Sequence, residues 1–190
     1  MCKLSRYGNC DSDTENQEYC IFHKPEKTEK EVGEFWRKFF ERFKPEEKIF
    51  EGRKRLVFEK DVNCRGYVFP HGLSFKYAVF KGKADFSEAK FSGYANFSYA
   101  KFSIADFISA EFSNVDFIGT KFSNAYFSDA EFSGYANFSY AKFSIADFIS
   151  AEFSNVDFIG TKFSNAYFSD AEFSGYANFS YAKFSIADFI

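Results

Sequence analysis

Histidine and cysteine are absent from the whole chain after His71. The 190 residues include only two histidines, four cysteines, three prolines and one tryptophan, against 31 phenylalanines. Catalysis needs a few unlike groups that converge in one pocket. The missing residue types therefore argue against an active site in most of the chain, and we expect a protein that is not an enzyme.

Long apolar runs are missing as well. No stretch of 18 or more consecutive apolar residues occurs, so the sequence contains no typical membrane-spanning helix. The first ten residues, MCKLSRYGNC, also lack the apolar core of a secretory signal peptide. We therefore expect a cytoplasmic protein with no membrane partner. Few prolines and 46% hydrophobic residues argue against disorder.

Repetition is what the sequence has in excess. Phe91–Glu131 is 41 residues long, residues 132–172 copy it without a change, and residues 173–190 begin a third copy. Internal repeats of this kind decide the architecture. Within the unit, phenylalanine recurs at every fifth position, with a step of six at FSGYANF, and a small or β-branched residue lies two positions before it. This period fits neither a helix nor a strand, so the chain must turn once per pentapeptide.

The pentapeptides ADFSE, AKFSG, ANFSY, ADFIS and AEFSN resemble the motif A-(D/N)-(L/F)-x-x of the pentapeptide repeat family. The resemblance covers about residue 56 onward. It implies an all-β solenoid, a right-handed quadrilateral β-helix in which four pentapeptides form one coil and the central residue points inward. The chain departs from the family by using Phe where Leu is preferred.

The six-residue steps each contain a glycine. We expect these glycines to lie at corners where one extra residue bulges outward, because glycine accepts a positive φ without steric cost. The positions are Gly82, Gly93, Gly134 and Gly175.

The N-terminal leader contains three cysteines and a histidine with the spacing C-x7-C-x9-C-x2-H. The residues are Cys2, Cys10, Cys20 and His23. Three thiolates and one imidazole form a complete tetrahedral set for structural zinc, so we predict a small Cys3His zinc module. The first spacing is wider than in usual zinc motifs, and free thiols or a disulfide are the alternatives. A closed four-ligand site leaves no position for catalysis.

An amphipathic helix is predicted after the leader. Thr28 and Glu31 have the spacing of a capping box, an aromatic stripe follows at helical spacing, and Pro45 ends the pattern. We expect this helix, or the segment after it, to cover the N-terminal end of the solenoid.

The basic cluster at residues 53–55 is interpreted as a solvated linker with too few charges to bind nucleic acid. The predicted domains are 1–27, 28–45 and 56–190.

Stacking of every fourth pentapeptide predicts columns of outward side chains. One column contains Lys101, Lys121, Lys142, Lys162 and Lys183. The opposite column contains Lys90, Glu111, Glu131, Glu152 and Glu172. The other two mix Asn, Asp and Tyr. Residues 84–190 carry 6 basic and 13 acidic side chains, a net charge of −7, whereas residues 1–83 carry 18 and 14, a net of +4.

These columns predict a non-catalytic binding or scaffold protein that presents a rigid charged surface to an unknown protein partner. Two alternatives stay open. Some members of the resembled family mimic DNA and modulate type II topoisomerases, and the leader would otherwise be a zinc-knuckle targeting module with the array as spacer. Nucleic acid is not an expected partner.

Self-association is expected in two forms. Side-by-side association is expected through the lysine and glutamate columns. End-to-end association, or a truncated chain, is expected because the sequence stops beside a core Phe at Ile190.

Overall fold

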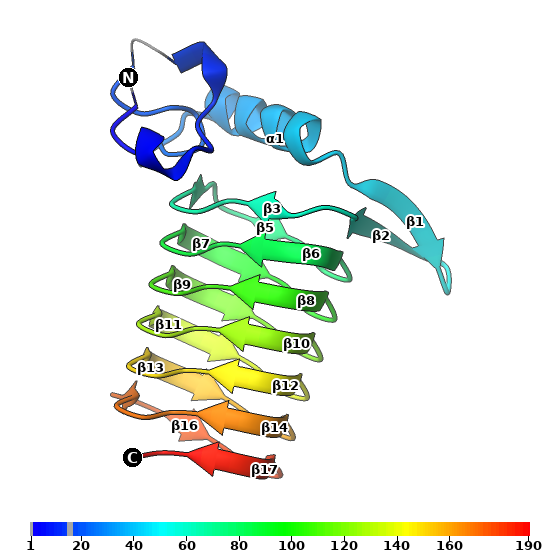
Figure 1. Cartoon of the computed structure of the whole chain (residues 1–190), viewed down its shortest axis with the longest axis vertical. Coiled ribbons are helices and arrows are strands. Elements are labelled where there is room, and N and C mark those ends of the chain that lie inside the picture. Colours follow the sequence, from blue (N-terminus) through cyan, green and yellow to red (C-terminus); the bar gives the residue numbers. More distant parts are fainter. Residues whose placement is uncertain (1, 15–16) are drawn as a thin grey trace.

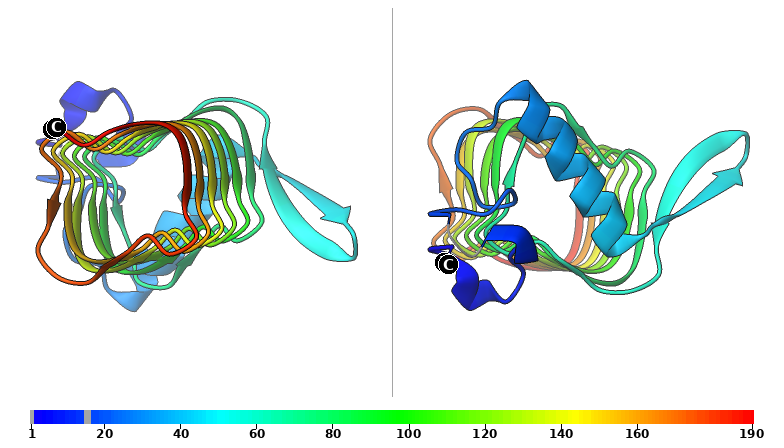
Figure 2. Two further views of the ribbon diagram at one scale, coloured as in Figure 1. Left: turned by 90° about the horizontal axis from the view of Figure 1, so that it is seen from below. Right: turned by 90° about the horizontal axis from the view of Figure 1, so that it is seen from above.

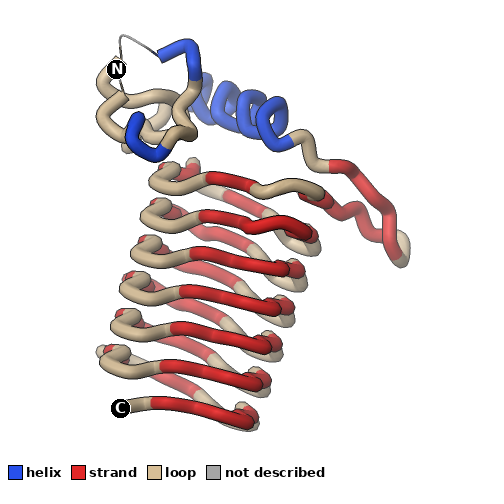
Figure 3. Tube along the Cα trace, in the orientation of Figure 1, coloured by secondary structure: helices blue, strands red, loops and turns tan. Residues whose placement is uncertain are grey.

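The computed structural model describes residues 2–14 and 17–190. It shows a β-solenoid of about six turns, four-sided in cross-section, with the leader and a helix at its N-terminal end (Figures 1 and 2). The turns stack directly on one another, and almost all regular structure in the solenoid is strand (Figure 3). The predicted all-β solenoid is confirmed. The division into three domains stays a prediction.

The strands of the solenoid form two parallel sheets on opposite sides of its axis (Figure 1). The first sheet contains β2 (Arg53–Phe58), β3 (Val62–Asn63), β6 (Val79–Asp85), β8 (Lys101–Asp106), β10 (Lys121–Tyr126), β12 (Lys142–Asp147), β14 (Lys162–Tyr167) and β17 (Lys183–Asp188), with β1 (Glu46–Phe50) added at its edge. The second sheet contains β4 (Val68–Phe69), β5 (Leu73–Ser74), β7 (Lys90–Asn96), β9 (Glu111–Asp116), β11 (Glu131–Asn137), β13 (Glu152–Asp157), β15 (Glu172–Phe173) and β16 (Ala177–Asn178).

Each pair of pentapeptides forms one strand and one tight turn. In β8, Phe102 and Ala105 point inward and are buried, while the side chains around them face outward. The next turn runs from Phe107 to Ala110, whose N–H donates to the Phe107 carbonyl over 3.0 Å. Ser109 at the third position has φ 54°, as a type II turn requires. The five-residue period thus arises from strand and turn alternating along the chain.

Stacked phenylalanine rings fill the interior. Phe107 lies 5.0 Å from Phe127 in the next coil with an interplanar angle of 6°, and it meets Phe117 edge-on at 5.6 Å and 72°. Stacked and T-shaped pairs are both favourable geometries for aromatic rings. Each fully buried ring contributes roughly 1.5–3 kcal/mol of transfer free energy before the entropy of ordering is subtracted.

The six-residue steps do form bulges, but the predicted reason for glycine is wrong. The register of β11 shifts between Phe132 and Tyr135 where it pairs with β13. Gly134 has no positive φ and lies within a strand rather than at a turn. A Cβ added there would overlap the carbonyl oxygen of Ser113 in the preceding coil. Glycine is needed at this bulge because two backbones approach closely, not because of its torsional freedom.

The helix α1 (Glu29–Phe43) covers the N-terminal end of the solenoid, as predicted (Figure 2). Thr28 and Glu31 form the complete capping box. The buried rings of the helix pack on the first coil: Phe35 lies 5.6 Å from Phe69, and Phe39 lies 5.7 Å from Phe75. The helix therefore shields a layer of aromatic rings that would otherwise face water.

A hairpin that the sequence analysis did not predict follows the helix. β1 pairs antiparallel with β2, and Phe50 lies opposite Arg53. Residues 53–55 therefore belong to a strand and not to a linker. The hairpin projects outward from the N-terminal end of the first sheet (Figure 1). In the leader, two short 3-10 helices, η1 (Ser5–Tyr7) and η2 (Ser12–Thr14), lie above the first coil.

Candidate metal centre and charged columns

The four predicted metal ligands lie together in the leader. The Sγ atoms of Cys2, Cys10 and Cys20 and a ring nitrogen of His23 all lie within 4.8 Å of one another. His23 Nδ1 is 3.7 Å from the Sγ of Cys2, 3.6 Å from that of Cys10 and 2.9 Å from that of Cys20. The group is almost fully buried, with Cys10 the most exposed member.

Local hydrogen bonds position these side chains. The N–H groups of His23 and Lys24 both donate to the Cys20 carbonyl, over 3.0 and 2.9 Å, so the C-x2-H segment closes as a tight turn. The Cys20 N–H points at the Cys2 Sγ over 3.4 Å. Together these contacts bring residues that are 21 positions apart to one centre.

The arrangement fits a tetrahedral zinc ion. Zinc–sulfur and zinc–nitrogen bonds of about 2.3 and 2.0 Å imply ligand separations of roughly 3.5–3.8 Å, and two of the three sulfur–nitrogen distances lie in this range. The other ring nitrogen of His23 lies 3.4 Å from the Arg65 carbonyl, the usual second contact of a metal-binding imidazole.

The protonation of these groups also matches metal binding. Burial lowers the pKa of His23 to about 4, so its imidazole is neutral at neutral pH and has a lone pair for a metal. Burial raises the pKa of Cys20 and of Cys10. Without a cation both stay protonated, whereas a bound divalent ion would stabilise their thiolates.

The cysteine–histidine cluster is attached to the solenoid by an aromatic and polar network. Phe22 stacks on Tyr67 of the first coil at 4.5 Å with an angle of 2°. Tyr67 donates its hydroxyl hydrogen bond to the Asn9 carbonyl over 3.2 Å and accepts one from Arg42 of α1 over 2.7 Å. Leader, helix and first coil therefore meet at one buried tyrosine.

The sequence analysis did not single out Tyr67 or Arg42. One signal was present for Tyr67, because it lies two residues before Phe69, at a position that holds Ala, Val or Thr before every central Phe from Phe80 onward. The first coil carries larger residues at this position, with Leu56 and Leu73 in addition to Tyr67. Nothing in the sequence distinguishes Arg42 from the other charged residues of the helix.

The lysine column consists of the lysines that begin five consecutive strands of the first sheet. Adjacent members are aligned residue by residue in the parallel pairings: Lys101, Lys121, Lys142, Lys162 and Lys183. Their spacing is that of stacked strands, about 4.8 Å. Within residues 2–14 and 17–190, none of these lysines forms an ion pair.

A shallow groove of about 740 Å³ follows the lysine column over several coils. Serine hydroxyls line it beside the lysines, one from each coil: Ser103, Ser123, Ser144, Ser164 and Ser185. Among the residues that the structure describes, no carboxylate lines this groove. The surface therefore offers a row of cations with a parallel row of hydrogen-bonding hydroxyls.

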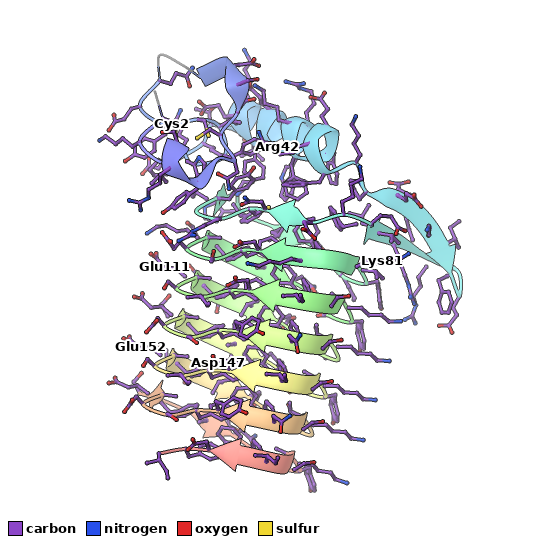
Figure 4. The ribbon with its side chains drawn as sticks, viewed as in Figure 1. Cys2, Arg42, Lys81, Glu111, Asp147 and Glu152 are labelled. Carbon is purple, nitrogen blue, oxygen red and sulfur yellow. The ribbon has the colours of Figure 1, made fainter. Side chains whose placement is uncertain are left out.

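The glutamate column is aligned in the same way in the second sheet. Its members are Lys90, Glu111, Glu131, Glu152 and Glu172. Lys90 Nζ lies 2.6 Å from Glu111 Oε1, which neutralises that glutamate. Figure 4 shows Glu111 and Glu152 pointing away from the side where Lys81, next to the top of the lysine groove, projects. The two columns therefore face opposite sides of the solenoid.

The remaining two columns are less uniform. One alternates Asn and Asp, and its aspartates accept hydrogen bonds from tyrosine hydroxyls: Tyr94 donates to Asp116 and Tyr135 to Asp157. The other alternates Asp with Tyr126 and Tyr167. Neither presents an uninterrupted row of one charge.

Comparisons with known proteins agree with this architecture. Two family descriptions of pentapeptide repeats match the chain, one over residues 75–119 and 104–151 and the other over residues 136–175 and 151–189. Together they cover more than half of the sequence. A search of curated proteins found no match. Among the described residues, no helix combines the length and the apolar character needed to cross a membrane.

Proposed function

This chain belongs to the pentapeptide repeat proteins, and from that premise we propose that it is a non-catalytic interaction scaffold whose lysine column binds an extended anionic partner. The observation that carries the proposal is the row of five aligned lysines, none of which forms an ion pair among the described residues. Cations stacked about 4.8 Å apart repel one another. A bound row of anions would relieve that repulsion.

The rest of the surface supports a scaffold more than a mimic of duplex DNA. A DNA mimic needs negative charge on the surfaces that its partner encloses. Here the glutamate column occupies one side, aspartates occur in the two intermediate columns, and the side opposite the glutamates carries the lysine column. The repeating interior also supports the proposal, because a rigid core keeps the column straight without any ligand.

Binding of a fluorescent oligoglutamate peptide tests this proposal. We expect affinity that falls steeply with added salt, and a loss of at least tenfold in the variant Lys121→Gln/Lys142→Gln/Lys162→Gln. The matched control, Lys30→Gln/Lys60→Gln/Lys76→Gln, removes three exposed lysines elsewhere and is expected to bind as the parent does. Equal weakening in both variants would show that overall charge, not the column, attracts the peptide.

A second proposal concerns the leader, which we infer holds one structural zinc ion through Cys2, Cys10, Cys20 and His23. The closeness and donor chemistry of the four side chains support it. Such an ion would fix the leader against the first coil, because His23 also contacts the Arg65 carbonyl. This supports a role as part of the cap rather than as an independent targeting module.

Elemental analysis of purified protein tests the zinc proposal. We expect one zinc per chain in the parent and none in Cys20→Ser. Cys64→Ala is the control, because Cys64 is a fully buried cysteine of the solenoid interior and outside the cluster. Absence of zinc from parent protein prepared in zinc-containing medium would refute the site.

A further inference from the structure

We propose that the anionic partner of the lysine column is the glutamate column of a second copy of this chain. This inference rests on the proposed scaffold function and names its partner. The copies would lie side by side, with the solenoid axes parallel and the lysine side of one against the glutamate side of the next.

The first argument is the match in spacing. Both columns gain one member per coil, because both are carried by parallel strands of the same solenoid. Lysine and glutamate therefore repeat with one common rise, about 4.8 Å. A partner with another repeat would lose alignment after a few coils, whereas a second copy stays aligned along the whole column.

The second argument is the availability of the charges. Glu131, Glu152 and Glu172 form no ion pair among the described residues, and neither do the lysines. Each column thus lacks within its own chain the partner that the other column would supply in a neighbour. Charge complementarity of this kind fixes orientation and register more than it adds affinity.

The positions of the columns determine the form of the assembly. Because they face opposite sides (Figure 4), a contact between two copies leaves one lysine column and one glutamate column free. Contacts of this head-to-tail type do not close and extend into rows. The expected product is a series of growing oligomers rather than a closed dimer.

The projecting hairpin β1–β2 restricts how a neighbour can approach. It stands on the side of the lysine column, at the N-terminal end (Figure 1). A neighbour that shifts toward the C-terminal end by whole coils clears the hairpin. Such a shift keeps Glu111, Glu131, Glu152 and Glu172 in step with the lysines that they still overlap, because the repeat is the same in both columns.

Exposed ion pairs are individually weak and are screened by salt. The rows are therefore expected at high protein concentration and low ionic strength, and they should dissolve as salt is added. An assembly held by buried apolar surface would not dissolve as salt is added, since salt does not screen such contacts.

Charge reversal gives the decisive test. One variant carries Lys121→Glu/Lys142→Glu/Lys162→Glu and the other Glu131→Lys/Glu152→Lys/Glu172→Lys. Sedimentation velocity is measured at an ionic strength of about 0.02 M and again at about 0.5 M, where the Debye length is short. We expect the parent to associate only at low salt, each variant alone to stay monomeric, and an equimolar mixture of the two to associate again.

The control Lys30→Glu/Lys60→Glu/Lys76→Glu has the same net charge as the first variant and is expected to keep the association. Circular dichroism of every variant verifies that the solenoid is folded. A parent that stays monomeric at low salt, or a mixture that does not associate, overturns the inference. If that parent still binds oligoglutamate through the column, only the choice of partner fails. If it binds neither, the proposed scaffold function fails as well.

Discussion

The leader and the repeat array both bury aromatic rings, but they arrange their contacts differently. In the array, one geometry recurs from coil to coil, and Phe127 relates to Phe148 as Phe107 does to Phe127. In the leader and helix each contact occurs once: Arg42 lies over the Phe22 ring at 4.7 Å, and Lys27 lies over the Phe35 ring at 5.2 Å. The array repeats one packing geometry, whereas the cap depends on many different contacts that each occur once.

This difference predicts how each region responds to damage. A coil of a solenoid contacts only its neighbours, so its stability is approximately a sum of local terms. In the cap, by contrast, the leader, α1 and the first coil meet at Tyr67, and the cysteine cluster holds the leader together. Loss of one contact there should release several segments together.

Removal of the zinc ion that we propose for the leader is expected to have the largest effect and to separate the two regions. Structural zinc sites contribute about 10 kcal/mol or more to folding in small metal-binding modules. A strong chelator should therefore unfold residues 2–14 and 17–27 and loosen α1, while β8–β14 stay folded. Hydrogen exchange measures both regions in one sample. Uniform loss of protection along the chain would contradict the comparison.

Truncation of one phenylalanine in each region comes next. Phe127→Ala and Phe39→Ala both remove a fully buried ring and should each cost about 3–5 kcal/mol. For Phe127 the damage should stay within the adjacent coils, because only these contact the cavity. For Phe39 the helix should detach and expose the aromatic layer of the first coil.

Limited proteolysis distinguishes these two outcomes. Cleavage near residues 44–52 is expected in Phe39→Ala alone. Early cleavage at the same place in Phe127→Ala would mean that damage spreads through the array.

Alanine substitutions at two glycines, one in each region, should change stability in opposite directions and by smaller amounts. Gly134→Ala should destabilise the array by about 1–3 kcal/mol, because the new methyl group overlaps the Ser113 carbonyl and one backbone must move. Gly33→Ala lies in α1 with no atom within 4 Å of the added carbon and should stabilise the helix by up to about 1 kcal/mol. Urea denaturation measures both. Equal effects of the same sign would contradict this interpretation.

Acid should produce the smallest and most local effect. Hydrogen bonds from Lys24 and from Thr28 lower the pKa of Glu31 from 4.5 to about 2. Because the folded state holds the ionised form, this contribution is complete above pH 4.5 and disappears as the pH falls toward 2. The protection of the amides of residues 29–31, measured relative to the intrinsic exchange rate at each pH, should fall over that range.

Glu31→Gln should flatten the pH response at residues 29–31, because Gln keeps a hydrogen-bonding side chain and cannot titrate. Glu29→Gln, in the same first turn, is the matched control and should respond as the parent does. If Glu31→Gln showed the same pH dependence as the parent, titration of Glu31 would not be the cause of that dependence.

The features that could be predicted from sequence are those fixed by short-range pattern. The period of five gave the inward positions, the Thr28–Glu31 spacing gave the capping box, and the order of pentapeptides gave the charged columns. Cysteine and histidine identified the four candidate metal ligands by residue type, although the first spacing is not diagnostic. In each case the deciding residues are neighbours in the chain or in the repeat.

The features that could not be predicted depend on contacts between distant segments. The need for glycine at position 134 comes from a backbone one coil away. The link from Arg42 to Tyr67 joins a helix to a coil 25 residues later. The hairpin at residues 46–58 has charged strands with no alternation of apolar and polar residues, so no periodic pattern marks it.

The bulge at each FSGYANF has a consequence for how such a protein can change its size. A unit of 41 residues is two coils plus this one extra residue, so a whole unit returns the chain to the same rotational position. Recombination between identical copies would therefore lengthen or shorten the molecule in steps of about 10 Å, with every inward ring and outward charge still in place. The length of the molecule along its axis can therefore change only by whole repeat units, and each such change is inherited with the gene.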